Sequence, residues 1–583
     1  MVEAADTIET ALDISCSSSE NLILDDFRRL TGPGFLWSHV GANLDVLCPT
    51  ADLDEVIKVW QQQARRVLDA IGWHSEQIID RRFEGGANLA VSAPMDQLYS
   101  AMFACQTAWH FASAQLLNQT ANNFDIMIND LRNIMVREAN PALITLITAA
   151  KKHGVDVLCD DDHLSLGHGE GSQTWSVFDL PKPTEVNWHS LHDIPVALIT
   201  GTNGKTTSTR LCSAIGAAAG LIAGITSTEF VRVGDDILDY GDYSGPGGAR
   251  MLLRDKRLQV AFLEVARGGI LRRGLPLRQA QAALVTNVAA DHLGQYGVNT
   301  VEELAVAKFS VHRTLAANGV LVLNADDEYV RAEVTRTQAI LCWFSLNPAH
   351  PLITQAKTKG HTCAWQEGDH LVYFDGTKAY PVVNVKDIPI SMGGAADYNI
   401  RNALGALCLA KVMNIDNKAI ALGLCNFKND AKDNPGRCNE FAIKGARVFV
   451  DFAHNPHSIS AVTDAMAGVP AKRRFIMISH AGDRSDQDIL DATQSALALN
   501  PDFLMAAELP QYLRGRELGE TLRLTHQQAI KHGLKTHQLL VAEGPAAGAK
   551  QILSQLQEGD LALLLVLSER DQVFAILDPA LTH

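Results

Sequence analysis

The chain has 583 residues, of which 47% are hydrophobic types and 20% are charged. This composition excludes intrinsic disorder, collagen-like repeats and a long coiled coil, and the length suits about two to four domains. Fifty basic residues against 66 acidic ones leave a formal charge of −16, which argues against sequence-independent binding to nucleic acid or to an anionic membrane.

The cysteines and the amino terminus indicate the compartment. Ten cysteines are spread along the chain without a CxxC pair, which is typical of a reduced protein. The first residues are acidic and lack the basic and apolar regions of a signal peptide. Since no apolar run approaches the roughly 20 residues that span a bilayer, we expect a cytoplasmic protein.

Residues 1–190 predict an α+β N-terminal domain that ends in a linker. A strand-like LDVLCP follows the turn TGPG at 31–34, and helical patterns cover Asp52 to Ile71 and Met102 to Leu117. The histidines of this part are isolated, so we expect structural or solvent-facing roles for His39, His74 and His110.

Residues 151–190 differ in composition from the rest. Asp160, Asp161, Asp162 and His163 could suggest a metal site, but four consecutive residues cannot all face one ion, so a solvated loop is favoured. The glycines in GHGEG resemble a phosphate loop only weakly, because no lysine or arginine accompanies them. The proline-containing DLPKPTEVNW is typical of a linker.

From residue 191 to 430 the pattern predicts an α/β domain. PVALIT, VAFLEV, AALVTNV and GVLVLNAD are buried-strand runs, each separated by helical or loop segments, and the first is followed by a helix of small and apolar residues over 208–219. This alternation is typical of a mostly parallel sheet with helices on both faces. The alternation restarts in ARVFVDFAHNP, RRFIMISHAGD, PDFLMAAE, THQLLVAE and DLALLLVLSE, which predicts a Rossmann-like C-terminal domain over 431–583.

The strongest motif is GTNGKTT at 201–207, directly after a strand and before a helix. Such a loop surrounds phosphate oxygens with backbone N–H groups at a helix N-terminus. Lys205 adds a positive charge at the β- and γ-phosphates, and the Thr206 hydroxyl can ligate Mg²⁺. The sequence therefore predicts an ATP site formed by Gly201, Thr202, Asn203, Gly204, Lys205, Thr206 and Thr207.

Three further segments place ionisable side chains near the ends of predicted strands. Glu264 ends VAFLEV, where a carboxylate could ligate Mg²⁺, although a helix cap or salt bridge would explain it equally well. Asp291 and His292 follow the strand AALVTNV, and Lys308 lies on the next helix.

Together these segments resemble the Mur ligase superfamily of ATP-dependent amide ligases. The resemblance rests on GTNGKTT, FLEVARGG, TNVAADHLGQYG, LAVAKFSVHR, LNADD, DYNIRNALGALCLA, NPGR and VDFAHNP, in this order. EVARGGILRRG, GDYSGPGGA and AGDRSDQDI are most similar to the Mur-type half of cyanophycin synthetases. The resemblance is specific from about residue 195 to 488 and weaker beyond.

The resemblance implies roles for individual residues. Lys205, Glu264, His292 and Lys308 would be catalytic, with Thr206, Glu264 and His292 around Mg²⁺ and a carbamate on Lys308. Asn399, Arg437 and Asp451 match nucleotide contacts. His454, Asn455, Asp483 and Arg484 are weaker candidates for substrate contacts.

The N-terminal part is only faintly similar to cyanophycin synthetase. RRLTGPGFLW and FEGGANLAVSAPMDQLYSA resemble its N-terminal domain, and residues 146–176 resemble only the entrance of its ATP-grasp domain. The chain then runs directly into the phosphate loop, so we expect the ATP-grasp domain to be missing. Repetitive polymerisation would then need a separate ligase as partner, and single-step tailoring of a peptide would not.

The reaction implied is attack of an acceptor carboxylate on the γ-phosphate of ATP, followed by attack of an amine on the acyl phosphate. We expect an aspartate-bearing or other short peptide acceptor, an amino acid as the amine, and self-association. Ser485 replaces an arginine of the synthetase-like GDRRD, which leaves the amine open. The alternatives are a glutamate ligase of the folylpolyglutamate synthase type and a non-catalytic ATP-binding regulatory subunit.

Overall fold

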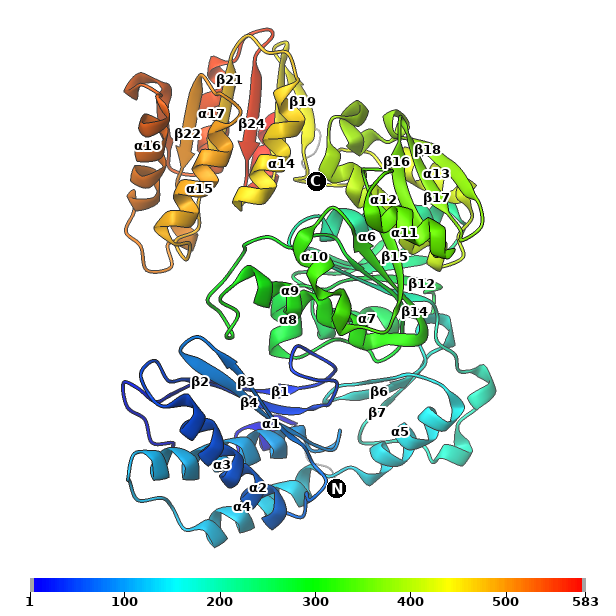
Figure 1. Cartoon of the computed structure of the whole chain (residues 1–583), viewed down its shortest axis with the longest axis vertical. Helices are drawn as coiled ribbons and strands as arrows, with labels where there is room; N and C mark the ends of the chain where they lie inside the picture. Colours follow the sequence, from blue (N-terminus) through cyan, green and yellow to red (C-terminus); the bar gives the residue numbers. More distant parts are fainter. Residues whose placement is uncertain (1–4, 579–583) are drawn as a thin grey trace. The chain divides into compact units, whose positions relative to one another are not determined.

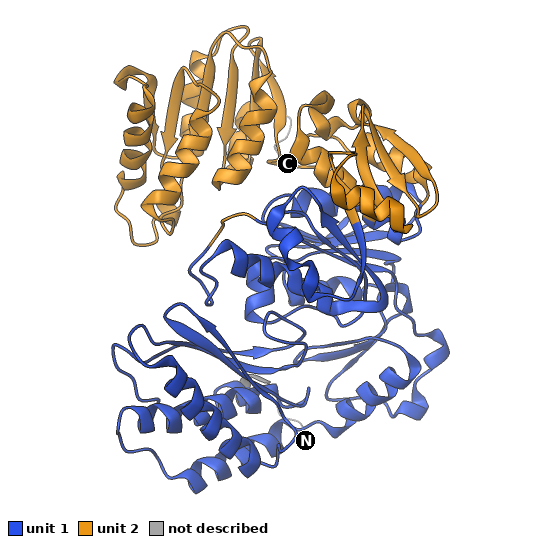
Figure 2. Cartoon of the chain, in the orientation of Figure 1, with its two compact units in different colours: residues 1–288, 293–342, 409–415 blue, residues 289–292, 343–408, 416–583 orange. Residues whose placement is uncertain are grey.

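The computed structural model describes residues 5–578, which form two compact units (Figure 2). The first unit comprises residues 1–288, 293–342 and 409–415, and the second comprises residues 289–292, 343–408 and 416–583. The prediction of a mixed α/β architecture with large, mostly parallel sheets is confirmed, whereas the boundaries at 190/191 and 430/431 remain predictions.

The N-terminal domain of the first unit is a four-stranded antiparallel sheet with helices packed on it. The sheet order is β1-β2-β4-β3. Asp52 caps α2 by accepting from the backbone N–H groups of Asp54 and Glu55, and α3 is buried from Leu98 to Ala114, as its apolar sequence predicts. The elements are α1 (Ala5–Glu9), β1 (Ile23–Leu30), β2 (Gly41–Leu47), α2 (Leu53–Ala70), β3 (Ile78–Phe83), β4 (Gly86–Ser92), α3 (Leu98–Leu116), α4 (Phe124–Glu138) and α5 (Pro141–His153).

The predicted linker contains a small sheet of its own. Strands β5 (Val157–Cys159), β6 (His163–Leu166) and β7 (Gln173–Ser176) form an antiparallel meander. Residues 160–162 form the loop between β5 and β6, in which Asp161 and Asp162 are exposed, as the solvated-loop interpretation expects. Asp160 accepts from Arg254 at 2.6 Å, and Asp161 accepts from Arg29 at 2.7 Å, so both carboxylates are held in ion pairs with arginines.

The rest of the first unit is a twisted sheet with the strand order β11-β10-β9-β12-β8-β13-β14. Strands β9, β12, β8, β13 and β14 are parallel, as the alternating pattern predicts, whereas β10 and β11 add an antiparallel edge that the sequence pattern does not predict. The elements are β8 (Val196–Thr200), α6 (Lys205–Ala218), β9 (Ala223–Thr226), β10 (Phe230–Val233), β11 (Asp236–Tyr240), α7 (Pro246–Leu253), β12 (Val260–Glu264), α8 (Arg267–Arg272), β13 (Ala280–Val285), α9 (Val301–Phe309), β14 (Leu315–Asn324) and α10 (Glu328–Ala332).

The second unit contains a short four-stranded sheet segment and a complete six-stranded sheet. In the former, β15 and β16 are parallel and β16, β17 and β18 form an antiparallel meander. Its elements are β15 (Ile340–Ser345), α11 (Pro351–Lys359), β16 (Cys363–Glu367), β17 (His370–Phe374), β18 (Ala379–Asn384), α12 (Asp397–Val412) and α13 (Asn417–Asn426).

The six-stranded C-terminal sheet has the order β19-β20-β24-β21-β22-β23 and is parallel except at β19. Neighbouring residues of β20 face opposite cores, since Phe449 packs with α14, α15 and α16 whereas Val448 and Val450 pack with α17 and α18 (Figure 1). This doubly wound arrangement confirms the predicted Rossmann-like domain. The elements are β19 (Asn439–Ile443), β20 (Ala446–Asp451), α14 (Pro456–Ala467), β21 (Arg474–Ile478), α15 (Asp486–Leu497), β22 (Phe503–Ala507), α16 (Glu520–His532), β23 (Leu539–Ala542), α17 (Pro545–Gln555), β24 (Leu561–Leu565) and α18 (Arg570–Leu577).

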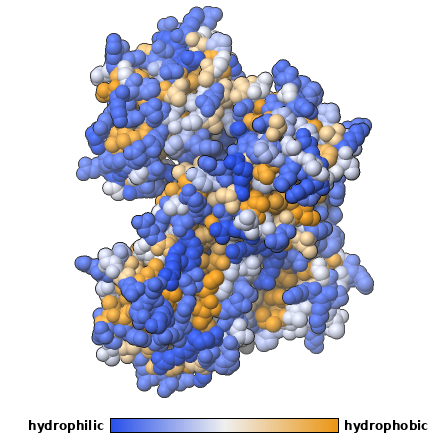
Figure 3. Space-filling view, viewed as in Figure 1, coloured by the Kyte–Doolittle hydropathy of each residue, from blue (hydrophilic) through white to orange (hydrophobic). Residues whose placement is uncertain are grey.

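The surface carries mostly polar residues on the face seen in Figure 3, with apolar residues scattered between them. Between residues 5 and 578, none of the helices is both long enough and apolar enough to cross a membrane. All ten cysteines are free thiols. His110 is buried with hydrogen bonds to Ser15 and Asn122, whereas His39 and His74 are exposed, as expected for structural and solvent-facing histidines.

Candidate active site

The loop that follows β8 has the backbone geometry of a phosphate-binding loop. Gly201 and Gly204 have φ angles of 147° and 83°, in the region that favours glycine, and a Cβ at Gly201 would lie 1.9 Å from Thr286 Oγ1. Helix α6 begins at Lys205, whose Nζ donates to the carbonyl of Thr202 at 2.9 Å. The loop therefore places backbone N–H groups, a helix N-terminus and an ammonium group together, which suits a polyphosphate.

Thr206 and Glu264 are brought together at this loop. Strand β12 runs parallel to β8, with Glu264 opposite Ile199, so that both strands end at the same edge of the sheet. The Thr206 hydroxyl donates to Glu264 Oε2 at 2.9 Å, and both residues are buried. A hydroxyl and a carboxylate side by side are the oxygen ligands that Mg²⁺ prefers, so these two residues fit the predicted metal site.

Two residues that the sequence analysis did not single out hold the loop in place. Asn287 accepts from the backbone N–H of Asn203 at 3.0 Å and donates to the carbonyl of the same residue at 2.9 Å. The Thr286 hydroxyl donates to that carbonyl at 2.7 Å. Their signal was visible in VTNVAADH, where two polar residues directly follow a buried strand.

Lys308 also reaches the loop. It lies near the end of α9, only 4% of the residue is exposed, and its Nζ donates to the Gly201 carbonyl at 2.8 Å. The helix begins with a capping box in which Thr300 and Glu303 satisfy each other's backbone N–H groups. Thus Lys205, Thr206, Glu264 and Lys308, predicted from three separate motifs, meet at one loop of the first unit.

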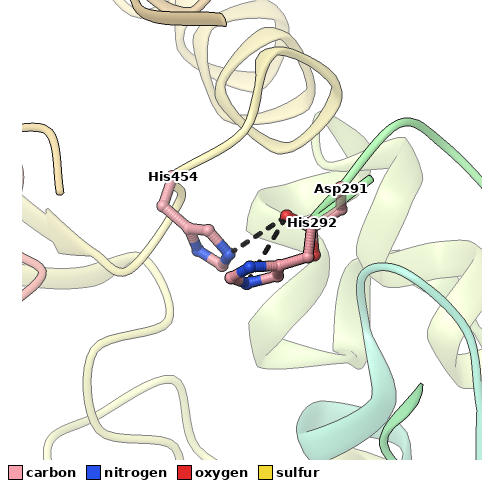
Figure 4. A group of neighbouring side chains, drawn as sticks. All are labelled: Asp291, His292 and His454. Atoms are coloured by element: carbon pink, nitrogen blue, oxygen red, sulfur yellow. Dashed lines mark ion pairs between the residues drawn. The ribbon is translucent and has the colours of Figure 1, made fainter. Parts of the chain in front are cut away.

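His292 lies in the second unit, in a polar cluster with Asp291, His454 and Arg484. Asp291 Oδ1 lies 3.9 Å from His292 Nε2 and 4.0 Å from His454 Nε2 (Figure 4). Arg484 donates to Asp291 at 3.2 Å, and its second terminal nitrogen lies 3.4 Å from His292 Nε2. The donor set could hold a divalent metal, but the Arg484 guanidinium already supplies positive charge beside the carboxylate.

The backbone and the pKa values of this cluster are also unusual. His292 adopts a left-handed conformation with φ of 50°, which costs a non-glycine residue about 1 kcal/mol. Burial lowers the pKa of His454, and the nearby Arg484 acts in the same direction against Asp291. The neutral imidazole of His454 is therefore favoured.

The remaining candidates in the second unit lie around β20. Burial raises the pKa of Asp451, at the end of β20, to about 6, although Arg437 and the backbone N–H groups of Cys438, Phe452 and Ala453 oppose the rise. The guanidinium of Arg437 lies 5.0 Å from the centre of the Phe452 ring. A buried carboxylate with a raised pKa beside an arginine is typical of a functional site.

Three other candidates have structural contacts of their own. Asn399 is buried and donates to the carbonyl of Ile390, and Asn455 caps α14 by accepting from the backbone N–H of Ser458. Asp483 pairs with Arg514. These contacts hold the side chains of Asn399, Asn455 and Asp483 in place. Their roles in nucleotide or substrate binding remain predictions.

The chain matches two models of protein families. Residues 199–410 match the Mur ligase middle domain, and residues 436–565 match the Mur ligase, glutamate ligase domain. The chain is 36% identical over 349 residues to a cyanophycin synthetase from Trichormus variabilis and 37% identical over 331 residues to one from Synechocystis. These matches cover 60% and 57% of this chain but only 38% of each relative.

The chain is also similar to a ligase with another name and to a solved structure. A UDP-N-acetylmuramate–L-alanine ligase from Stenotrophomonas maltophilia is 27% identical over 373 residues, covering 63% of this chain and 70% of the relative. E. coli FolC in complex with ADP superposes with a TM-score of 0.51 at 18% identity, over 67% of this chain and 90% of that one, which shows a shared fold.

A phosphate loop at the end of a parallel strand, with a threonine–carboxylate pair beside it, defines a P-loop α/β protein. The two family models together cover more than half of the chain, and both come from one family. The chain belongs to the Mur ligases through its middle and C-terminal domains.

Proposed function

We propose that this protein is an ATP-dependent amide ligase that activates a carboxylate as an acyl phosphate and joins it to an amino acid amine. The observation that carries the proposal is the convergence of Lys205, the Thr206–Glu264 pair and Lys308 on one loop. This set supplies positive charge and metal ligands for a triphosphate, which is what phosphoryl transfer to a carboxylate needs.

In the proposed reaction, an acceptor carboxylate oxygen attacks the γ-phosphorus of ATP in line, and the bond to the bridging oxygen of ADP breaks. The amine then attacks the acyl carbon, phosphate leaves and the amine nitrogen loses a proton. Lys205 offsets charge on the phosphates, and Thr206 and Glu264 would hold Mg²⁺. Bound Mg²⁺ would neutralise part of the negative charge of the phosphates.

The second unit would contribute contacts to nucleotide and substrate. We assign Asn399, Arg437 and Asp451 to the nucleotide, His292 to the metal site, and His454, Asn455, Asp483 and Arg484 to the substrates. Because the chemistry asks little covalent work of side chains, positioning and exclusion of water from the acyl phosphate would provide most of the rate enhancement.

For the substrates, we propose an aspartate-bearing or other short peptide as acceptor and an amino acid as the amine. The support is the identity to relatives named cyanophycin synthetase. Ser485 caps α15 through Asp488, so the position where the motif departs from those relatives serves the helix. We further propose that the protein self-associates and that a separate ligase supplies any alternating addition.

The decisive experiment is a screen of amino acids with short acidic peptides, read by mass spectrometry together with nucleotide analysis. A product heavier by one amino acid less water, formed with ADP, supports the proposal. Formation of AMP in place of ADP would contradict the acyl-phosphate mechanism. A pteroyl substrate as the sole acceptor would indicate a folylpolyglutamate-type ligase, and binding of ATP without turnover on any pair would indicate a regulatory subunit.

A further inference from the structure

Two loops of the second unit pack against each other where β21 and β22 end. The first, residues 479–485, follows β21 and contains the substrate candidates Asp483 and Arg484. The second, residues 508–519, follows β22 and leads into α16. The two strands are parallel neighbours, so both loops leave the same edge of the C-terminal sheet. We call them the Arg484 loop and the Arg516 loop.

Arg516 joins the two loops through its guanidinium. Its Nε donates to the Gly482 carbonyl at 3.0 Å, and one terminal nitrogen donates to the Arg484 carbonyl at 2.7 Å. That nitrogen also lies 2.7 Å from Asp486 Oδ1, and the other terminal nitrogen donates to Glu520. The Arg516 side chain is only 14% exposed. A planar set of donors can reach all four groups at once, whereas the ammonium group of a lysine cannot.

The backbones of the two loops also fit closely. A Cβ at Gly482 would lie 1.8 Å from the Leu513 carbonyl oxygen, so only glycine lets the loops approach this far. Arg514 and Gly515 have φ angles of 44° and 99°. A left-handed arginine followed by a left-handed glycine makes a sharp turn, which persists only when surrounding contacts hold it. This turn directly precedes Arg516.

The Arg516 loop is fixed at its base by a buried carboxylate. Glu508 accepts from the backbone N–H of Gly519 at 2.7 Å and from the Thr521 hydroxyl at 3.3 Å. Only 5% of Glu508 is exposed. The two ends of the loop are therefore tied together, and Arg516 projects from a closed, supported segment.

The Arg484 loop carries the effect of Arg516 to the polar cluster described above. Arg516 holds the main chain of Arg484, whereas the side chain of Arg484 contacts Asp291 at 3.2 Å and lies 3.4 Å from His292 Nε2. A long, rotamer-rich side chain keeps such contacts only when its own backbone is fixed. The position of the Arg484 guanidinium therefore depends on a residue that does not touch the cluster.

We propose that Arg516 is a positioning residue, which fixes the backbone of Arg484 and thereby the place of the Arg484 guanidinium beside Asp291 and His292. For its effect on turnover this inference rests on the proposed ligase function, in which Arg484 is assigned to the substrates. The positioning itself is measurable without ATP or turnover.

The first test is NMR of the protein with ¹³C-labelled histidine, in which the His292 signal is identified by its loss in His292→Gln. Arg484→Ala should shift this signal, because the neighbouring guanidinium is removed. Arg516→Lys keeps the charge but loses the planar donors, and should shift the His292 signal in the same direction.

Arg473→Lys is the matched control. Arg473 also pairs with a carboxylate, that of Asp560, and donates to a backbone carbonyl, that of Gln555, but it directly precedes β21 and so lies at the opposite end of that strand. It should leave the His292 signal in place. Glu520→Gln is a second variant, which keeps Arg516 and weakens its ion pair, and should shift the signal by a smaller amount in the direction of Arg516→Lys.

The second test is a double-mutant cycle in steady-state kinetics. Arg484→Ala should raise the KM for one substrate about tenfold and leave the KM for ATP unchanged. Arg516→Lys should raise the KM for the same substrate. The double variant should lie within about twofold of Arg484→Ala alone, since the positioning then has no guanidinium to act on.

A His292 signal that is unmoved in Arg484→Ala or in Arg516→Lys would overturn the inference. So would an equal shift in Arg473→Lys, or effects of Arg484→Ala and Arg516→Lys that multiply in the double variant. A shifted His292 signal in a protein without turnover on any substrate pair would uphold the positioning role and contradict only the ligase function.

Discussion

The ε-amino nitrogen of Lys308 donates a hydrogen bond to the Gly201 carbonyl over 2.8 Å, although 107 positions separate the two residues in sequence. Helix α9 is thereby tied to the first glycine of the phosphate loop. A lysine that reaches this loop can act as a cation or, once carbamylated, as an anionic metal ligand. The ammonium and carbamate forms of Lys308 differ in charge, and only the carbamate form predicts that kcat depends on bicarbonate.

Carbamylation of Lys308 is tested by removal of CO₂. If Lys308 carries the carbamate that the resemblance implies, depletion of bicarbonate should lower kcat, and added bicarbonate should restore it, since the modification is reversible. Intact-protein mass spectrometry under mild conditions should detect the added CO₂ in the wild type and not in Lys308→Arg. A kcat that is indifferent to bicarbonate would assign Lys308 to the ammonium form that contacts Gly201.

Lys205→Ala should abolish most turnover. Loss of a preorganised cation at the phosphates typically costs about a hundredfold to a thousandfold in kcat. The readout is acceptor-stimulated release of ADP, with Lys550→Ala on the exposed face of α17 as the control of matched charge. If Lys205→Ala turned over at the wild-type rate, the assignment of this loop to ATP would have to be abandoned.

Thr206→Val should shift the requirement for Mg²⁺. The substitution keeps the shape of the side chain and removes the hydroxyl that donates to Glu264, so one metal ligand is lost. We expect the Mg²⁺ concentration for half-maximal ADP release to rise about tenfold, in the range that loss of one good hydrogen-bonding contact produces. Thr209→Val, on the same helix with its hydroxyl bonded to the Lys205 carbonyl, should leave the Mg²⁺ curve in place.

The raised pKa of Asp451 predicts a pH-dependent stability. With a folded-state pKa of about 6 and an unfolded one of about 4, the folded protein holds a proton that the unfolded chain has lost between these values. The free energy of unfolding should therefore fall as pH rises through this window, by up to about 3 kcal/mol, and this contribution should level off above it.

Urea denaturation of the wild type and of Asp451→Asn between these pH values measures the effect. The variant should show a shallower decline, because the amide does not titrate. Asp464→Asn, at an exposed position of α14, should retain the wild-type slope. A slope shared by all three proteins would contradict the burial of an ionising Asp451.

Gly32→Ala should destabilise the first unit. The added Cβ would lie 2.1 Å from the Leu275 carbonyl oxygen, so the backbone has to move. Overpacking of this kind costs about 1–3 kcal/mol, which thermal unfolding would report as a lower Tm. Gly468→Ala, where a Cβ would meet open space, is the control and should unfold at the wild-type temperature.

The sequence was most informative where local chemistry determines structure. The phosphate loop, the helix from Asp52 and the parallel strands could be predicted because glycines, caps and apolar runs act over a few residues. The helix α3 was predictable from its apolar sequence alone. The edge strands β10 and β11 were not, since β11 is exposed and lacks the apolar pattern of a buried strand.

Long-range pairing was the part that could not be predicted from the residues. The ion pair between Asp161 and Arg29 had no local signal, because the two residues are 132 positions apart. The meeting of Thr206 with Glu264 was expected only because both follow parallel strands of one sheet.

The short meander β5–β7 has a consequence for how the protein can be divided. Asp161 pairs with Arg29 of the N-terminal sheet, Asp160 pairs with Arg254 beyond α7, and the backbone N–H of Glu170 donates to the Leu258 carbonyl. The meander therefore contacts both the N-terminal sheet and the phosphate-loop domain. A shortened protein that starts near residue 191 would remove these contacts from the phosphate-loop domain. The meander therefore contributes contacts to the first unit, and we expect this unit to be expressed best as one piece.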